Sequence, residues 1–384
     1  MRDYRQDFSD FSPNIYLDCA YQGPFPRATV ARIQHALALK CNPAHLDAEE
    51  YFSLPERVRT LFARLIGADT HEIAITNSAT QGIGIVATGL GLRAGDEVVI
   101  ASPNFPSNLF TWLHLRRLGV RVRVIRPAGD HVTPEEVLEE LTPRTRVLAL
   151  DWVSYTGGSR IDLAAFGDLV HRHGGIFVVD GTQGVGALPL KIHALPVDAM
   201  VVAGYKWLLG PYGTGFVYLR LGLLDRLELP VVNWMSVEGS EDFDALPIED
   251  FTLPRAARIF DVPETPNFLN LYAMEASLEF VAQAGVETVF DHCKRLNERL
   301  AEGLRAQGFR LSDAALAQYR STILGFRADS NESTTALHRH LREQNIAVSL
   351  RHGFIRVSPY LYNTEEDINR LLEAVGGRLA AAGI

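Results

Sequence analysis

The chain has 384 residues, of which 47% are hydrophobic and 22% charged, the balance of an ordinary globular protein with one or two domains. Its formal net charge of −9 argues against a nucleic-acid partner, because neutralising phosphates needs an excess of Lys and Arg. No apolar run reaches the ~18 residues that suggest a membrane span, and the polar start MRDYRQDFSDF shows no secretory signal, so we expect a cytoplasmic protein. Cys19, Cys41 and Cys293 form no metal-ligand spacing, and we expect no metal site.

Short apolar runs separated by helical patterns predict the first part of the fold. Strands are expected at residues 72–76, 96–102, 120–126, 146–153, 175–180, 198–204 and 214–220, with helices at 79–90, 107–118 and 163–174. Thr133-Pro134-Glu135-Glu136 is a capping box with proline in the first turn, and it predicts a further helix. Strands that are apolar throughout and alternate with helices indicate an α/β fold with a mostly parallel, seven-stranded sheet sandwiched by helices.

The alternation of apolar strands and helices ends at about residue 225. Residues 228–268 are rich in proline and acids and weakly periodic, and a loop this long is usually functional or a linker. A helix is predicted at residues 269–284, followed by helices that alternate with strands at STILGFRA and GFIRVSP. We expect a large domain over residues 21–250 and a smaller α+β domain over residues 251–384, with residues 1–20 packing near the functional site.

Two polar side chains stand at the ends of predicted strands, where open α/β sheets bind ligands. Asp180 ends the run GGIFVVD and needs a partner, because an unpaired buried carboxylate is destabilising; a structural acid that caps a turn or pairs with arginine is the commoner alternative. Lys206 follows the run DAMVVAGY. An apolar site disfavours its charged form and makes it a nucleophile toward a carbonyl, although a surface lysine with its amine in water is an equal alternative.

The segment Asn77-Ser78-Ala79-Thr80 lies between a predicted strand and a predicted helix. Free N–H groups and hydroxyls at a helix start bind anions, although a plain N-cap is commoner. The helix also contains GIGIVA, whose glycines fall within the helix and not in the turn before it, which argues against a dinucleotide fingerprint. A nucleophilic lysine, a buried acid and an anion-binding helix start together indicate pyridoxal 5'-phosphate, which offers them an aldehyde, a pyridine nitrogen and a phosphate.

With these residues and the blocks VVDGTQGVGALPL, AGYKWLLGPYGTGFVYLR and IRVSPYLYNTEEDI, the chain resembles the class V aminotransferase family of fold-type I pyridoxal-phosphate enzymes. The resemblance extends from residue 14 to residue 368 and points to the branch of cysteine desulfurases, kynureninase and isopenicillin-N-epimerase-like proteins. It implies that Lys206 forms the internal aldimine and that Asp180 pairs with the pyridinium nitrogen. It also implies cofactor contacts by Ser78, Ala79, Thr80 and Tyr205 near the phosphate, Phe105 stacked on the ring, Gln183 at the phenolic oxygen, and Ser154.

The resemblance also assigns residues around the substrate. Arg356 would bind the α-carboxylate as a bidentate donor, with His352 and Tyr21 close to the substrate. Thr265 matches a segment that reaches the cofactor phosphate from the neighbouring subunit, although the family's preceding glycine is Glu264 here. The resemblance therefore implies a homodimer with shared active sites.

Several reactions stay open. Desulfurases of this family carry a nucleophilic cysteine shortly before the carboxylate-binding arginine, and residues 345–359 contain none, which argues against persulfide chemistry. We expect an enzyme that acts on a small-molecule amino acid through an external aldimine, first as a class V aminotransferase. A kynureninase-like, C–S or β-eliminating lyase, or an epimerase, is the alternative, and a cofactor-binding protein without turnover is a further one.

Overall fold

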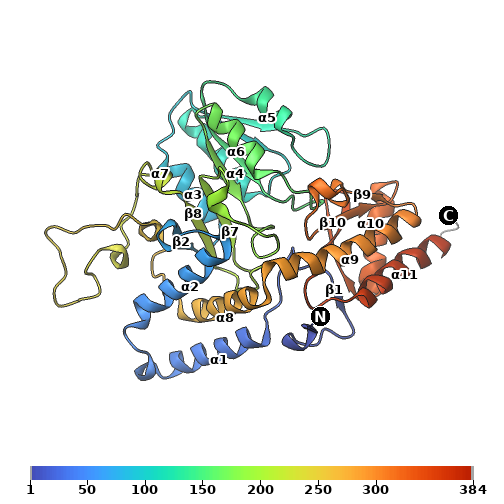
Figure 1. Cartoon of the computed structure of the whole chain (residues 1–384), viewed down its shortest axis with the longest axis horizontal. Helices are drawn as coiled ribbons and strands as arrows, with labels where there is room; N and C mark the ends of the chain where they lie inside the picture. The colour runs from blue at the N-terminus through green and yellow to red at the C-terminus, as the bar shows by residue number, and fades with distance from the viewer. Residues whose placement is uncertain (1, 382–384) are drawn as a thin grey trace.

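The computed structural model describes residues 2–381 and contains the predicted seven-stranded sheet (Figure 1). The strand order is β2-β8-β7-β6-β5-β3-β4. Strands β3 to β7 run parallel, whereas β8 pairs antiparallel with both β7 and β2. All seven predicted strands are confirmed within two residues: β2 (Ile73–Thr76), β3 (Glu97–Ala101), β4 (Arg121–Ile125), β5 (Thr145–Asp151), β6 (Ile176–Asp180), β7 (Ala199–Ala203) and β8 (Gly215–Leu219).

Helices cover both faces of this sheet, because alternate residues of each apolar strand point to opposite sides. One face packs against α3 (Ala79–Gly89) and α4 (Ser107–His114). The other packs against α2 (Glu50–Ile66), α5 (Pro134–Glu140), α6 (Leu163–Arg172) and α8 (Phe268–Ala284), and α1 (Arg27–Cys41) lies along α8. The predicted capping box at Thr133 is present at the start of α5, and both glycines of GIGIVA lie inside α3.

A second, smaller sheet follows in the chain, as the sequence predicted. Its antiparallel order is β12-β13-β10-β9, formed by β9 (Arg310–Leu311), β10 (Leu324–Arg327), β12 (Ser349–Arg351) and β13 (Phe354–Val357). Helices α9 (Val286–Ala306), α10 (Asn331–Glu343) and α11 (Glu365–Ala381) accompany it. Near the N-terminus, β1 (Ile15–Tyr16) pairs in parallel with β11 (Ile346–Ala347) and so joins the first residues to this part of the chain. The domain boundaries expected at residues 20 and 250 stay predictions.

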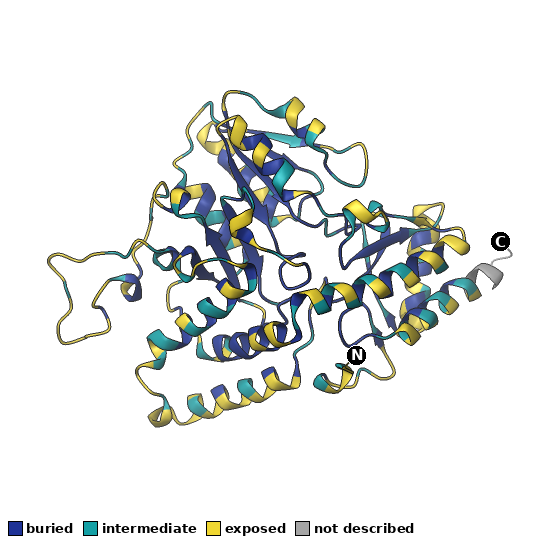
Figure 2. Cartoon of the chain, in the orientation of Figure 1, coloured by how far each residue is buried: buried dark blue, intermediate teal, exposed yellow. Residues whose placement is uncertain are grey.

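The segment between α7 (Leu221–Leu224) and α8 forms a loop that projects from the body (Figure 1) and is exposed along most of its length (Figure 2). Its C-terminal end is fixed by Arg59 of α2, which donates to Asp261 at 2.7 and 3.0 Å. Asp261 also accepts the N–H of Ile75 at 2.8 Å, so the base of the loop is tied to β2. The loop carries two short 3-10 turns, Trp234–Ser236 and Ala257–Phe260. The 3-10 turns in other parts of the described chain are Arg5–Asp7, Pro43–His45, Thr70–Glu72, Leu115–Leu118, Ile192–Ala194, Asp313–Ala315 and Ala317–Tyr319.

Among residues 2–381, no helix combines the length and the apolar character that crossing a membrane requires.

Candidate active site

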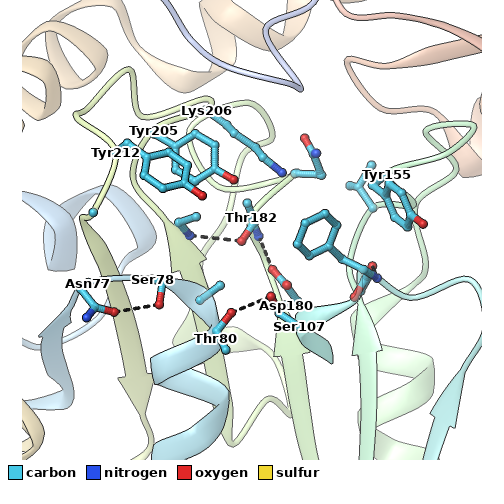
Figure 3. A pocket seen from close by; sticks show the side chains of 17 residues that line it. Asn77, Ser78, Thr80, Ser107, Tyr155, Asp180, Thr182, Tyr205, Lys206 and Tyr212 are labelled. Atoms are coloured by element: carbon cyan, nitrogen blue, oxygen red, sulfur yellow. Dashed lines mark hydrogen bonds between the residues drawn. The ribbon is translucent and has the colours of Figure 1, made fainter. Parts of the chain in front are cut away.

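A pocket lies at the carboxyl ends of β5, β6 and β7 and at the start of α3 (Figure 3). This is the edge where parallel sheets bind ligands. Most of the residues that the sequence assigned to the cofactor line it together, although they come from distant parts of the chain: Ser78, Ala79, Thr80, Phe105, Asp180, Gln183, Tyr205 and Lys206.

Lys206 follows β7 and is 6% exposed, held by the fully buried residues Trp207, Leu208 and Leu209 that come after it. Its Nζ lies 5.0 Å from the centre of the Phe105 ring and 5.7 Å from that of Tyr205, and points into the pocket (Figure 3). Burial lowers the pKa of Lys206 to about 8, although the nearby carboxylate of Asp180 partly opposes this shift. The fold therefore keeps this amine largely out of water and close to its neutral, nucleophilic form.

This pKa predicts how the cofactor-free protein reacts with pyridoxal phosphate. Only the neutral amine attacks an aldehyde, so the rate should rise as the pH approaches about 8 and level off above it. An ordinary lysine, with a pKa of about 10.4, would keep accelerating to about pH 10. Stopped-flow absorbance over a pH series measures the rate, and a steep rise that continued above about pH 9 would contradict the lowered pKa.

Two buried carboxylates stand side by side below this amine. Asp180 is the residue that the sequence indicated, and Asp151 lies beside it in the parallel register of β5 and β6. One oxygen of Asp180 accepts the N–H of Thr182 at 2.9 Å, and the Thr182 hydroxyl in turn accepts the N–H of Ala203 at 3.1 Å, which ties the end of β6 to β7. Burial raises the pKa of both carboxyls, and for Asp151 the charge of Asp180 adds to the effect. The sequence offered one signal for Asp151, an acid inside the otherwise apolar run RVLALDWV.

The start of α3 forms the anion-binding end of the pocket. The Ser78 hydroxyl caps the helix by accepting the N–H of Gln81 at 3.2 Å. Thr80 shares a hydrogen bond of 2.7 Å with Ser107 at the start of α4 (Figure 3), so hydroxyl groups from two helix starts meet here. The sequence predicted Ser78 and Thr80 but not Ser107. Hydroxyls and free N–H groups at a helix N-terminus are suited to a phosphate.

Arg356 and His352 do not line the pocket themselves but contact Tyr155, a lining residue that sequence reasoning missed. Arg356 is 2% exposed and donates to the carbonyl of Tyr155 at 2.8 Å and to the carboxylate of Asp18 at 3.0 Å. Its Nε is buried and has no hydrogen-bond partner among the described residues. His352 shares a hydrogen bond of 2.7 Å with the Tyr155 hydroxyl, and the Tyr155 ring packs edge-on against Phe105, with centroids 5.3 Å apart. Tyr155 thus connects both predicted substrate residues to the pocket.

Three other predicted residues lie outside the pocket lining. Ser154 bonds to the Thr156 hydroxyl at 2.8 Å, Thr265 donates to the carbonyl of Val262 at 2.7 Å, and Tyr21 is 56% exposed. Their roles stay predictions.

The amide group of Gln183, which does line the pocket, donates to the carbonyl of Ala20 at 3.0 Å and accepts the indole N–H of Trp207 at 2.8 Å. Its assigned contact with the phenolic oxygen is likewise a prediction.

The donor set of the pocket fits pyridoxal phosphate. Lys206 offers an amine for the aldehyde, Asp180 offers a buried carboxylate for the pyridine nitrogen, and the start of α3 offers a phosphate site. Phe105 offers an aromatic face between them. Together with the sheet topology, this arrangement is that of a fold-type I pyridoxal-phosphate enzyme.

Comparison with known proteins agrees with this class. A family model described as aminotransferase class-V matches residues 15–371, and the chain belongs to this family, whose cofactor is pyridoxal phosphate. A probable cysteine desulfurase of Methanothermobacter thermautotrophicus is 26% identical over 98% of each chain, and isopenicillin N epimerase of Streptomyces clavuligerus is 27% identical over 94% of each. The solved structure of cysteine desulfurase CsdA from Escherichia coli is similar over 98% of each chain, with a TM-score of 0.84 and 25% identity.

Proposed function

We propose that this protein is an aminotransferase that acts on a small-molecule amino acid. The observation that supports this most directly is the amine of Lys206, buried, without a hydrogen bond or ion pair among the described residues, and directed into a pocket that no cysteine lines. Bound pyridoxal phosphate supplies an electron sink for the bonds at the substrate α-carbon. Transamination needs from the protein only a proton carrier, a partner for the pyridine nitrogen and a carboxylate site, and the chain offers a residue for each.

In this proposal each residue has a separate task. Lys206 holds the cofactor aldehyde and, once released, moves a proton to and from the substrate α-carbon. Asp180 keeps the pyridine nitrogen protonated. Arg356, which contacts the lining residue Tyr155, binds the substrate carboxylate, while the bond to Asp18 fixes the plane of its guanidinium group.

The hairpin between β12 and β13 supports the case against persulfide chemistry. Arg351 pairs directly with Phe354, so His352 and Gly353 alone form the turn, and a long loop with a mobile cysteine has no place there. Cys19 and Cys293 are buried, and Cys41 lies at the end of α1. None of them lines the pocket.

A C–S or β-eliminating lyase is the second candidate, and the names of the relatives favour it. Two of the similar proteins are called cysteine desulfurases, a name that describes removal of sulfur from cysteine. The same Lys206 could move the α-proton in such a reaction, because elimination also begins at the α-carbon.

One experiment separates the two candidates. The purified protein is incubated with a panel of amino acids, with and without keto-acid acceptors, and the keto acids, ammonia and sulfide that form are measured. Transamination predicts turnover only when an acceptor is present. Ammonia or sulfide released without any acceptor would contradict transamination and support the lyase.

We further propose that the working unit is a dimer of this chain. The loop between α7 and α8 exposes apolar side chains that residues 2–381 leave uncovered, with exposed fractions of 65% for Phe243 and 84% for Ile248. Apolar groups gathered on one projecting segment usually mark an interface. The pocket is also open beside Tyr212, which lines it and is 73% exposed, so a second subunit has room to complete the wall.

We therefore expect the double variant Phe243→Asp/Ile248→Asp to be monomeric in analytical ultracentrifugation, where the wild type sediments as a dimer. Two charges placed in an apolar contact cost more than the interface can offset. Leu138→Asp, at a 51% exposed position of α5, is the matched control and should leave the dimer intact. Equal sedimentation of the double variant and the wild type would remove the loop from the interface.

A further inference from the structure

Asp151 is a buried acid in the pocket wall to which the proposed mechanism gives no task. It is 8% exposed and neighbours Asp180 in the strand register. Two carboxylates placed together out of water are costly for folding, because each disfavours the charge of the other. An acid kept in such a place indicates a role in the site.

The contacts of Asp151 point to that role. One carboxylate oxygen accepts the backbone N–H of Phe105 at 2.6 Å, and the other accepts the side-chain amide of Asn108 at 3.0 Å. Phe105 lies in the turn that leads from β3 into α4, and Asn108 lies in the first turn of α4. The same turn is anchored at Asn104, whose side chain donates to the carbonyl of Ala149 at 3.0 Å. Ala149 and Asp151 of strand β5 therefore fix the position of this turn through hydrogen bonds.

The placement of the Phe105 ring depends on the position of this turn, which carries the ring. It is partly exposed to the pocket, touches Tyr155 edge-on, and faces the amine of Lys206. No other hydrogen bond to the N–H of Phe105 is present among the described residues. A shift of the turn would move the ring.

We propose that Asp151 is a positioning residue that holds the turn of Phe105 and so sets the placement of this ring against the cofactor. The proposal rests on the assignment of pyridoxal phosphate to this pocket. Asp151 acts through Phe105 and not on the reacting atoms.

The test is a double-mutant cycle on cofactor binding. Asp151→Asn keeps the shape of the side chain but turns an NH₂ group toward one of the two N–H donors, so one hydrogen bond is lost. We expect a rise of about tenfold in the dissociation constant of pyridoxal phosphate, measured by equilibrium dialysis. Phe105→Leu should raise it as well, and the double variant should lie within about twofold of Phe105→Leu alone, because the two residues act as one unit.

A second readout separates positioning from general stability. The visible circular dichroism of bound pyridoxal phosphate reports how the ring is held, and Asp151→Asn and Phe105→Leu should change it in the same direction. Asp198→Asn is the matched control: Asp198 also accepts a backbone N–H, that of Phe177 at 2.7 Å, but lies at the other end of the sheet. It should leave both the dissociation constant and the dichroism unchanged.

The following results would contradict the positioning role of Asp151. Wild-type affinity in Asp151→Asn, or effects that multiply in the double variant, would overturn the proposal. If Asp151→Asn does not fold, hydrogen exchange of the wild type replaces it: the amide of Phe105 should be protected, and exchange as fast as that of an exposed loop would equally overturn the proposal. Failure of the wild type itself to bind pyridoxal phosphate would instead refute the proposed function.

Discussion

Replacing Lys206 with alanine should lower turnover by roughly a thousandfold or more, because the same amine holds the cofactor and moves the α-proton. The variant should lose the visible absorbance of cofactor bonded to lysine, and borohydride should attach no pyridoxyl group to it. The fold should persist, since a buried amine with no ion pair among the described residues contributes little to stability, and its replacement removes the cost of keeping it out of water. Absorbance spectra, mass spectrometry after reduction and steady-state rates measure these effects.

Lys191→Ala is the matched control, because Lys191 lies on the exposed connection between β6 and β7. It should keep the spectrum and the rate of the wild type. A Lys206→Ala protein that still carried a reducible bond to pyridoxal phosphate would show that another amine holds the cofactor, and the assignment of Lys206 would be wrong.

The large sheet could be predicted almost completely from the sequence because all of its strands except β4, which lies at one edge, are buried on both faces. Each buried strand is an apolar run bounded by turn residues, and this signal depends on neighbours in sequence. The α7–α8 loop was also predictable, since its prolines and acids exclude a regular element. The antiparallel pairing of β8 was not, because a buried strand has the same composition in either direction.

The site was predictable in part, for a related reason. Asp180 and Lys206 stand at the ends of adjacent strands, so the rule for parallel sheets brings them together. Asp151 was not predicted as a site residue because the predicted strand continued to residue 153, which made the acid an interior position of that strand. Tyr155 and Ser107 belong to no local sequence motif, since each is linked to the site by a hydrogen bond to a residue far away in the chain.

The pairing of Asp18 with Arg356 joins residues 338 positions apart and has no local signal at all. Both side chains are nearly excluded from water, so each needs the other, and Asp18 also accepts the hydroxyl of Ser349. Two segments at opposite ends of the chain therefore meet next to Tyr155, which lines the pocket. Sequence reasoning found the arginine through the family resemblance but not the acid that holds it.

Asp180→Asn should lower the rate at saturating substrate by roughly a hundredfold to a thousandfold, while the protein folds as well as the wild type or better. The amide oxygen of Asn can still accept the N–H of Thr182, so the turn after β6 is kept. What is lost is the negative charge that keeps the pyridine nitrogen protonated. Removing a buried charge beside Asp151 also removes a repulsion that opposes folding, so the unfolding midpoint should not fall.

A lower rate without a lower unfolding midpoint distinguishes a role of Asp180 in chemistry from a role in folding. A residue retained for folding would lose both properties together when it is replaced, whereas a residue retained for chemistry should lose the rate alone. Rates are compared with the unfolding midpoint from thermal melts of the cofactor-free proteins, with Asp198→Asn as the control for losing a carboxylate that accepts a backbone N–H. Activity within about threefold of the wild type would mean that the charge of Asp180 does not act on the pyridine nitrogen, because a lost preorganised charge costs far more than that.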